Sequence, residues 1–386
     1  MKIGVPAEID GGESRVAATP ETIKKFIAFG ATVAVESGAG LASRITDADY
    51  EAAGATIAPD AAAAVADADV VLKVRRPVEA ELPAYKHGAL VIATMDPYGH
   101  EDAVNAMGAA GITAIAMEFM PRITRAQVMD VLSSQANLAG YQAVIDAASA
   151  YDRAMPMMMT AAGTVPAARV FVMGAGVAGL QAIATARRLG AVVTATDVRP
   201  AAKEQVESLG AKFVAVEDEE FKQAETAAGY AKPMSAEYQA KQAALVAEHI
   251  KKQDIVITTA LIPGRAAPRL VTAAMVASMR PGAVLVDLAV ERGGNVEGSK
   301  PGDIVDLDGR RIVGYLNVAG RIPATASQLY AKNLAAFLET LVDKASKALV
   351  VNWDDELVRA TVLTRDGAVV HPAFKPKTVT ADEGSL

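Results

Sequence analysis

The six-residue stretch from Gly174 to Gly179 has the spacing Gly-x-Gly-x-x-Gly. It follows a short apolar run, Val170–Met173, and leads into residues with apolar positions at helical spacing. In this context the first glycine permits a tight turn, the second lets a phosphate approach the backbone, and the third lets helix and strand pack closely. Because a helix N-terminus attracts anions, the motif predicts a dinucleotide pyrophosphate at the first helical turn. The expected contacts are Gly174, Gly176, Val177, Ala178 and Gly179.

The next apolar run, Val192–Thr196, ends in an acidic residue, Asp197. A carboxylate at this point accepts hydrogen bonds from the adenosine ribose and repels a 2′-phosphate, which predicts NAD(H) rather than NADP(H). Arg199 offers a cation to such a phosphate, and that lesser alternative stays open. The further expected nucleotide contacts are Val198 and Arg199 after this strand, and Ala260 and Leu261 after the strand Ile255–Thr258.

Groups that carry protons or bind metals are scarce in this sequence. The histidines, for which a surface position is expected, are His87, His100, His249 and His371, and none follows a strand at the predicted nicotinamide. No metal-ligand spacing or Ser–His arrangement occurs, so no metal is predicted. Asp287 and Glu291 follow another strand, where a catalytic and a capping role remain equally open. A polar cluster is open to two interpretations, helix capping or contacts to a carboxamide and ribose: Arg122, Arg125, Gln127, Asp130, Ser133, Ser134, Gln135 and Asn137.

Short β-branched runs alternate with helical patterns, which is typical of βαβ units around parallel sheets. The first series of expected strands is Lys2–Val5, Thr32–Glu36, Val70–Val74, Leu90–Ala93 and Ala114–Met117. The second series is Val170–Met173, Val192–Thr196, Phe213–Val216, Ile255–Thr258, Val284–Asp287 and Ile312–Gly314. The sequence therefore predicts an α/β protein with two Rossmann-like, doubly wound parallel-sheet domains.

Two long helical patterns flank the second series, one over 122–160 and one after Gly320. This arrangement predicts that the dinucleotide-binding domain is inserted into the other domain. We expect a composite domain of residues 1–133 plus 326–386, and an NAD(H)-binding domain of residues 134–325. The final segment, Thr361–Val370, is expected to be strand-like with a turn at Asp366 and Gly367.

The composition fits a soluble cytoplasmic protein of two domains. The chain has 386 residues, of which 52% are hydrophobic and 22% charged, enough to bury a sizeable core. The formal charge of −7 gives no electrostatic footprint for nucleic acid. Cysteine is absent, which excludes disulfides and thiolate chemistry. No signal peptide and no apolar run of about 18–20 residues is present, so no membrane span is predicted.

Two stretches, Met120–Tyr141 and Pro156–Pro166, resemble the soluble NAD(H)-binding component (domain I of the alpha subunit) of proton-translocating NAD(P)⁺ transhydrogenase. The likeness extends from Lys2 to about Pro372. The related alanine dehydrogenase shares the overall layout, including Arg15 and Lys73. It carries a catalytic Lys where this chain has Arg75 and a catalytic His where this chain has Asp96. Loss of both groups agrees with the missing proton carrier.

The resemblance implies direct hydride transfer between NADH on this chain and NADP⁺ on a partner subunit, coupled to proton translocation by the full complex. It implies catalytic positions at Arg122, Gln127 and Asp130, and a carboxamide-holding serine at Ser133. The implied partners are a second copy, an NADP(H)-binding subunit and membrane-spanning subunits. The protein would then be an enzyme that is active only with these partners, and peripheral on the cytoplasmic face of the inner membrane.

A long irregular stretch, Glu217–Met234, separates the third strand of the second series from a helix expected over Ser235–Lys252. Loops of this length are often lids, and a decorated surface loop is an equal alternative. The resemblance implies a mobile loop whose Tyr230 closes on the nucleotide. Two other functions stay open, a free-standing alanine-dehydrogenase-like enzyme and a non-enzymatic NAD(H)-sensing module.

Overall fold

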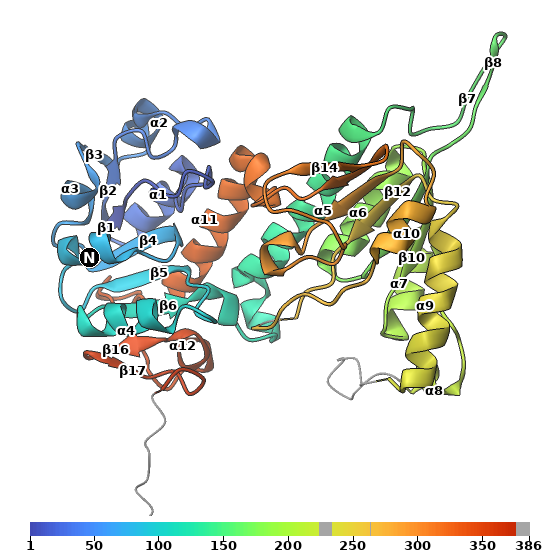
Figure 1. Cartoon of the computed structure of the whole chain (residues 1–386). Coiled ribbons are helices and arrows are strands. Elements are labelled where there is room, and N and C mark those ends of the chain that lie inside the picture. The colour runs from blue at the N-terminus through green and yellow to red at the C-terminus, as the bar shows by residue number, and fades with distance from the viewer. Residues whose placement is uncertain (224–233, 263, 376–386) are drawn as a thin grey trace, which may run out of the picture. The chain divides into compact units, whose positions relative to one another are not determined.

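The structure, a computed structural model, describes residues 1–223, 234–262 and 264–375. The chain folds into two compact units (Figure 1). The first unit comprises Met1–Ser134 and the segment that begins at Ile322. The second unit is the continuous stretch Gln135–Arg321. The second unit is therefore inserted between two segments of the first.

The described part of the first unit contains a six-stranded sheet in the order β3-β2-β1-β4-β5-β6. Its paired strands are parallel. Val70–Arg75 illustrates why these residues form inner strands, because five of its six residues are buried, as expected of a strand covered on both faces. The strands are β1 Lys2–Val5, β2 Thr32–Glu36, β3 Thr56–Ala58, β4 Val70–Arg75, β5 Leu90–Thr94 and β6 Thr113–Ala116.

The long helix α11, Pro323–Thr340, is central to the core of the first unit (Figure 1). Its Tyr330 is fully buried and donates its hydroxyl to the Lys73 carbonyl at 3.0 Å, while accepting from the Thr94 N–H at 3.1 Å. This ties α11 to the ends of β4 and β5. The other helices are α1 Pro20–Ala28, α2 Asp47–Ala52, α3 Ala61–Val65, α4 Glu101–Ala109 and α12 Glu356–Thr361; the hairpin β16 Thr364–Arg365 and β17 Ala368–Val369 follows.

The described part of the second unit contains a seven-stranded sheet in the order β11-β10-β9-β12-β13-β15-β14. Its strands pair in parallel except β14, which is antiparallel to β15. The direction of winding reverses between β9 and β12, the position where open α/β sheets bind ligands. The strands are β9 Arg169–Met173, β10 Val192–Thr196, β11 Lys212–Phe213, β12 Ile255–Thr258, β13 Val284–Asp287, β14 Ile304–Leu307 and β15 Arg310–Val313.

The helices associated with the second sheet contribute small residues to its core, such as Ala143 and Ala147 of α5 and Ala182 and Ala186 of α6. Small side chains allow close packing of a helix on a sheet. The helices are α5 Val131–Ala150, α6 Val177–Arg188, α7 Ala201–Ser208, α8 Glu219–Lys222, α9 Ala236–Ile250 and α10 Ala273–Ser278.

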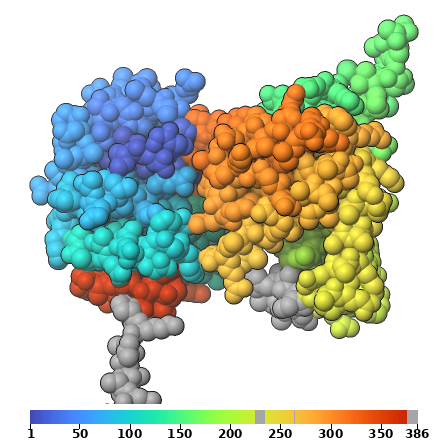
Figure 2. All heavy atoms as spheres, in the orientation of Figure 1, coloured from blue at the N-terminus to red at the C-terminus, as the bar shows by residue number. Residues whose placement is uncertain are grey.

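A two-stranded hairpin, β7 Met158–Thr160 and β8 Gly163–Val165, projects from the body of the second unit (Figure 1). All six strand residues are exposed, and Met159 retains 75% of its accessible surface. The space-filling view shows the hairpin standing clear of its own unit (Figure 2). It is therefore an apolar extension without packing partners among the described residues of this chain.

The predicted fold class is confirmed, since both units are α/β with parallel or largely parallel sheets. The predicted helix over 122–160 was too long, because α5 begins at Val131 behind the capping residue Asp130 and ends at Ala150. The expected strand Phe213–Val216 is shorter, with pairing only over Lys212–Phe213. Strands β3, β7, β8 and β14 were not predicted. None of the helices in the described ranges is long and apolar enough to cross a bilayer.

Candidate functional site

The glycine-rich turn lies between β9 and α6, at the carboxyl edge of the second sheet. Gly174 has φ +106, and Gly179 packs so closely that an added Cβ would lie 1.8 Å from the Gly174 carbonyl oxygen. A Cβ at Gly176 would meet no atom of the described residues within 4 Å. The first and third glycines are thus required by the chain itself. Gly176 instead leaves space on the outer side of the turn, where a bound group would approach.

The N-terminus of α6 opens onto this space. Gly176 is its N-cap and supplies no side-chain cap, so the first-turn N–H groups have no partner within the helix. Helix α5 holds this turn in place, because a Cβ at Gly140 would lie 2.0 Å from the Ala178 carbonyl oxygen. Sequence reasoning missed Gly140, whose role depends on a helix that is distant along the chain. The geometry fits an anion such as a pyrophosphate.

Asp197 follows β10 directly, and its carboxylate is nearly buried, with 8% of the side chain exposed. Its Oδ2 accepts the Ala175 N–H at 2.7 Å, so the glycine turn and the carboxylate are fixed to each other. Its Oδ1 accepts the Arg199 N–H at 2.9 Å, and the Arg199 guanidinium also binds the carboxylate. Val198 is exposed beside them.

The loop after β12 is held by a residue that sequence reasoning did not identify. Asn295 is fully buried; its Oδ1 accepts the Ala260 N–H at 3.0 Å and its Nδ2 donates to the Ala260 carbonyl at 2.9 Å. The same Nδ2 donates to the Pro268 carbonyl at 2.8 Å. This clamp fixes the Ala260 peptide, while the following Leu261 side chain is 52% exposed.

Asp287, for which two roles were open, serves the backbone. It is 1% exposed and accepts N–H groups of Ala289, Asn295 and Val296 at 3.0 to 3.1 Å. It therefore shapes the turn that carries Asn295. Glu291 accepts the Asn317 N–H at 2.7 Å. Both carboxylates have structural partners rather than the geometry of an acid–base pair.

The polar cluster of the first unit combines capping with exposed side chains. Asp130 caps α5, since its Oδ1 accepts the Ser133 N–H at 2.8 Å and its Oδ2 accepts the Ser133 hydroxyl. Arg125 forms a two-pronged ion pair with Asp355 at 2.8 and 2.9 Å. Arg122 and Gln127 are exposed. The capping interpretation thus accounts for Asp130 and for the ion pair of Arg125.

Helix α11 holds the 3₁₀ helix Thr124–Met129 that carries this cluster. Asn333 donates to the Val128 carbonyl at 2.8 Å and accepts the Ser134 hydroxyl at 2.7 Å. Asn333 is 8% exposed, so the anchoring is shielded from water. The loop residues therefore project from a rigid support, which was not apparent from the sequence.

A buried group of charges lies at β4 in the first unit. Lys73, 1% exposed, binds Glu81 at 2.8 Å and Glu8 at 3.5 Å. Glu13 binds Arg15 at 2.7 Å and Arg75 at 2.8 Å. Burial raises the pKa of Glu13, but hydrogen bonds and charge from Arg15 and Arg75 outweigh it and lower the pKa to about 2. Arg75, which stands where the resemblance implies a catalytic lysine, thus has a carboxylate partner within the chain.

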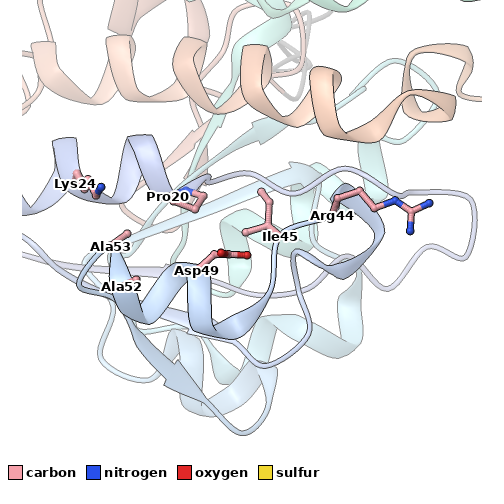
Figure 3. Close-up of a pocket in the computed structure, with 7 residues that line it drawn as sticks. All are labelled: Pro20, Lys24, Arg44, Ile45, Asp49, Ala52 and Ala53. Carbon is pink, nitrogen blue, oxygen red and sulfur yellow. The ribbon is translucent and has the colours of Figure 1, made fainter.

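Other candidate positions lie away from these groups. A surface pocket in the first unit, with a cavity volume of about 350 Å³, contains none of the predicted site residues (Figure 3). Of the histidines, His87 is exposed as expected, but the other three are partly buried. His249 bonds to Thr194 at 2.9 Å, and burial lowers its pKa. Tyr230 lies outside the described residues.

The structure thus gathers the turn Gly174–Gly179, Asp197 with Arg199, and Ala260 at the carboxyl ends of β9, β10 and β12. Val177 and Ala178 lie in the first turn of α6. In the first unit it gathers Asp130 and Ser133 at the start of α5. Each group is complete within its own unit. The first group has the features of a dinucleotide site, and the second has no acid–base pair.

Comparison with known proteins identifies both units of the chain. Residues 4–139 match the alanine dehydrogenase/PNT N-terminal domain, and residues 143–372 match the corresponding C-terminal domain. The crystal structure of transhydrogenase from Sinorhizobium meliloti superposes with a TM-score of 0.88 at 65% identity, covering 96% of this chain and 100% of that one. An L-alanine dehydrogenase structure has a TM-score of 0.81 at 27% identity, covering 97% and 98%.

Sequence relatives agree with the structural ones. An NAD(P) transhydrogenase subunit alpha chain of Rhodospirillum rubrum is 57% identical over 97% of this chain and 99% of its own length. Alanine dehydrogenase of Mycobacterium tuberculosis is 34% identical over 78% of this chain and 76% of its own length. The chain therefore belongs to the family of alanine dehydrogenases and NAD(P) transhydrogenase alpha subunits.

Proposed function

We propose that this protein is the NAD(H)-binding component of a proton-translocating NAD(P)⁺ transhydrogenase. Gly176 carries the nucleotide-binding part of the proposal, because the space beside it lies at the uncapped N-terminus of α6 and next to Asp197. The pyrophosphate would bind the first-turn N–H groups of Val177 and Ala178. Asp197 would receive the adenosine ribose hydroxyls, and Ala260 and Leu261 would lie under the adenine. Val198 and Tyr230 remain predicted contacts.

The nicotinamide supplies the hydride chemistry, so the protein needs to bring two nicotinamide rings to roughly 3–3.5 Å without transferring a proton. Ser133 donates its hydroxyl hydrogen to Asp130, which leaves the Ser133 oxygen as an acceptor. An acceptor suits the NH₂ group of a carboxamide. Arg122 and Gln127 are exposed on the anchored 3₁₀ helix and the residues that lead into it, where they would orient the ring and contact the partner. The chemistry of these residues supports positioning rather than acid–base catalysis.

Arg75 favours this function over that of a free-standing alanine dehydrogenase. The resemblance implies a catalytic lysine at this position, whereas here the arginine pairs with buried Glu13 at 2.8 Å. Asp96 stands where the resemblance implies a catalytic histidine. An arginine retains its proton at neutral pH and makes a poor general base. A proton-transferring amino-acid oxidation is thus poorly supported.

We also propose a homodimer, docked on an NADP(H)-binding subunit and on membrane-spanning subunits at the cytoplasmic face of the inner membrane. The apolar β7–β8 hairpin supports the dimer, because a lone two-stranded hairpin is marginally stable in water and exposed methionines favour burial. Replacing Met158 and Met159 with Ser should shift sedimentation toward the monomer. A dimer of unchanged affinity would contradict this role of the hairpin.

The decisive experiment measures reduction of an NAD⁺ analogue by NADPH, with this protein alone and with its NADP(H)-binding partner. We expect turnover only in the mixture. A parallel assay with alanine and NAD⁺ should give none. Alanine-dependent NADH formation by the protein alone would favour the dehydrogenase. NADH binding without turnover in either assay would favour a sensing module.

A further inference from the structure

The carboxylate of Asp197 has all its acceptor positions occupied by the chain. Oδ1 accepts the Arg199 backbone N–H and the Arg199 Nε–H, both at 2.9 Å. Oδ2 accepts the Ala175 N–H at 2.7 Å and the Arg199 Nη2 at 3.1 Å. A carboxylate offers about four lone-pair positions, so four donors leave none for a further hydrogen bond of good geometry.

The four donors fall into two classes. Two are backbone N–H groups, which hold the carboxylate against the glycine turn and need not move. The other two belong to the Arg199 guanidinium, which approaches both oxygens as a fork. The adenosine ribose also presents two donors, its vicinal hydroxyls, to the same two oxygens. The guanidinium and the ribose therefore require the same positions.

We propose that Arg199 is an internal competitor for the ribose site, and that its displacement from Asp197 sets how strongly the protein selects the 2′-hydroxyl over a 2′-phosphate. This inference rests on the proposed placement of the adenosine ribose at Asp197. The side chain of Arg199 is 32% exposed and that of Asp197 is 8% exposed. The guanidinium has room to leave towards solvent, whereas the carboxylate stays fixed.

Competition has opposite effects on the two nucleotides. The 2′-hydroxyl of NADH gains a hydrogen bond to Asp197 only after a charge-assisted one to Arg199 is lost, so its net contribution is small. A 2′-phosphate meets an Asp197 charge that Arg199 has partly neutralised, and the released guanidinium is able to pair with it. Arg199 thus lowers the discrimination that Asp197 alone would give.

A ligand series isolates this effect from other contacts of Arg199, such as stacking on the adenine. The dissociation constants of NADH, NADH lacking the adenosine 2′-hydroxyl, and NADPH are measured by calorimetry on the intact protein and on Arg199→Ala. In the variant, loss of the 2′-hydroxyl should weaken binding about 5- to 10-fold more than in the parent protein, the value of one unopposed hydrogen bond. The NADPH-to-NADH ratio should rise by about 10-fold or more, since an unscreened carboxylate faces the phosphate.

Two further variants sharpen the test. Arg199→Lys keeps the charge but loses the fork, so it should retain most of the NADPH tolerance while exposing more of the 2′-hydroxyl contribution. Arg188→Ala removes an exposed arginine from the last turn of α6 and should leave every ratio unchanged. Thermal unfolding of each variant excludes misfolding as the cause of a change.

The outcomes are distinct. Ratios in Arg199→Ala equal to or below those of the parent protein would overturn the competition, even if overall affinity changes. Asp197→Asn tests the underlying placement, because it should abolish the preference for the 2′-hydroxyl and reduce that for NADH over NADPH. If Asp197→Asn and Asp197→Ser both fold and keep the parent ratios, the ribose does not bind here and the proposed nucleotide site itself fails. If only the Arg199 ratios stay constant, the site stands and the competition is wrong.

Discussion

The three glycines of the turn allow a prediction that separates folding from nucleotide binding. Gly176→Ala adds a methyl group where the described chain has no atom within 4 Å, at a φ of −76 that alanine adopts freely. Gly179→Ala adds one 1.8 Å from the Gly174 carbonyl oxygen, in a position where real Cβ atoms stay beyond 3.0 Å. The first change should impair NADH binding and spare the fold. The second should impair the fold.

The magnitudes follow from local contacts. At the N-cap of α6, alanine is worse than glycine by roughly 0.5–1 kcal/mol, while reduced freedom of the unfolded chain returns about 0.4–1 kcal/mol. The stability of Gly176→Ala should therefore change by less than about 1 kcal/mol. A methyl group between backbone and pyrophosphate would weaken two charge-assisted hydrogen bonds, about 3 kcal/mol or 10²-fold in the dissociation constant. Gly179→Ala forces a backbone shift of about 1 Å and should cost about 1–3 kcal/mol of stability.

Urea unfolding and NADH calorimetry measure the two effects on the same preparations. Gly11→Ala is the matched control, because Gly11 is exposed and has no atom of the described chain near its added Cβ. If Gly176→Ala binds NADH within about threefold of the parent protein, the pyrophosphate does not lie against this turn. A marked loss of stability in Gly176→Ala would show instead that the turn has no spare space.

Three other predictions concern the first unit and the Ala260 loop. Arg122→Ala and Gln127→Asn should slow hydride transfer in the reconstituted complex by up to about 10²-fold, with NADH affinity nearly unchanged, and the reverse pattern would refute a positioning role. Glu13→Gln should cost roughly 3 kcal/mol in urea unfolding at pH 7, because the pKa of Glu13 falls from 4.5 to about 2 on folding. A lowered pKa stabilises above pH 4.5, so this cost should shrink as the pH falls towards 2, and a pH-independent cost would exclude ionic stabilisation. Asn295→Leu should weaken NADH binding about tenfold by loosening the loop, and unchanged affinity would limit Asn295 to folding.

Buried strands were predictable because their signal is local. β1, β2, β10, β12 and β13 have the bounds expected from their β-branched runs, since strands covered on both faces are continuously apolar. β3 and β14 escaped prediction because they are edge strands with mostly exposed or partly exposed residues. β7 and β8 are wholly exposed, so the core of this chain imposes no pattern on them. Apolar runs report burial, and pairing without burial leaves no comparable mark.

Helix ends depended on single side chains within a long polar segment. The apolar spacing over 122–160 is compatible with one continuous helix, but Asp130 binds the Ser133 N–H and starts α5 behind it. The same residue type is equally suited to a cofactor contact, which is why the two interpretations stayed open. Asp130→Asn is consequently a mixed perturbation, because it affects the cap together with any contact to the nicotinamide.

The candidate site divides in the same way, into residues recognisable by spacing and residues recognisable only by their distant partners. The turn Gly174–Gly179 and Asp197 carry a pattern because each must occupy a fixed place along one βαβ unit. Asn295 carries none, since its function is to hold a peptide 35 residues away at Ala260. Arg199 shows the difference most clearly. Its position two residues after Asp197 suggests a phosphate ligand, yet its guanidinium binds that carboxylate at 2.9 and 3.1 Å. The same charge therefore acts first on the protein's own selectivity residue, and any effect on a nucleotide depends on breaking that pair.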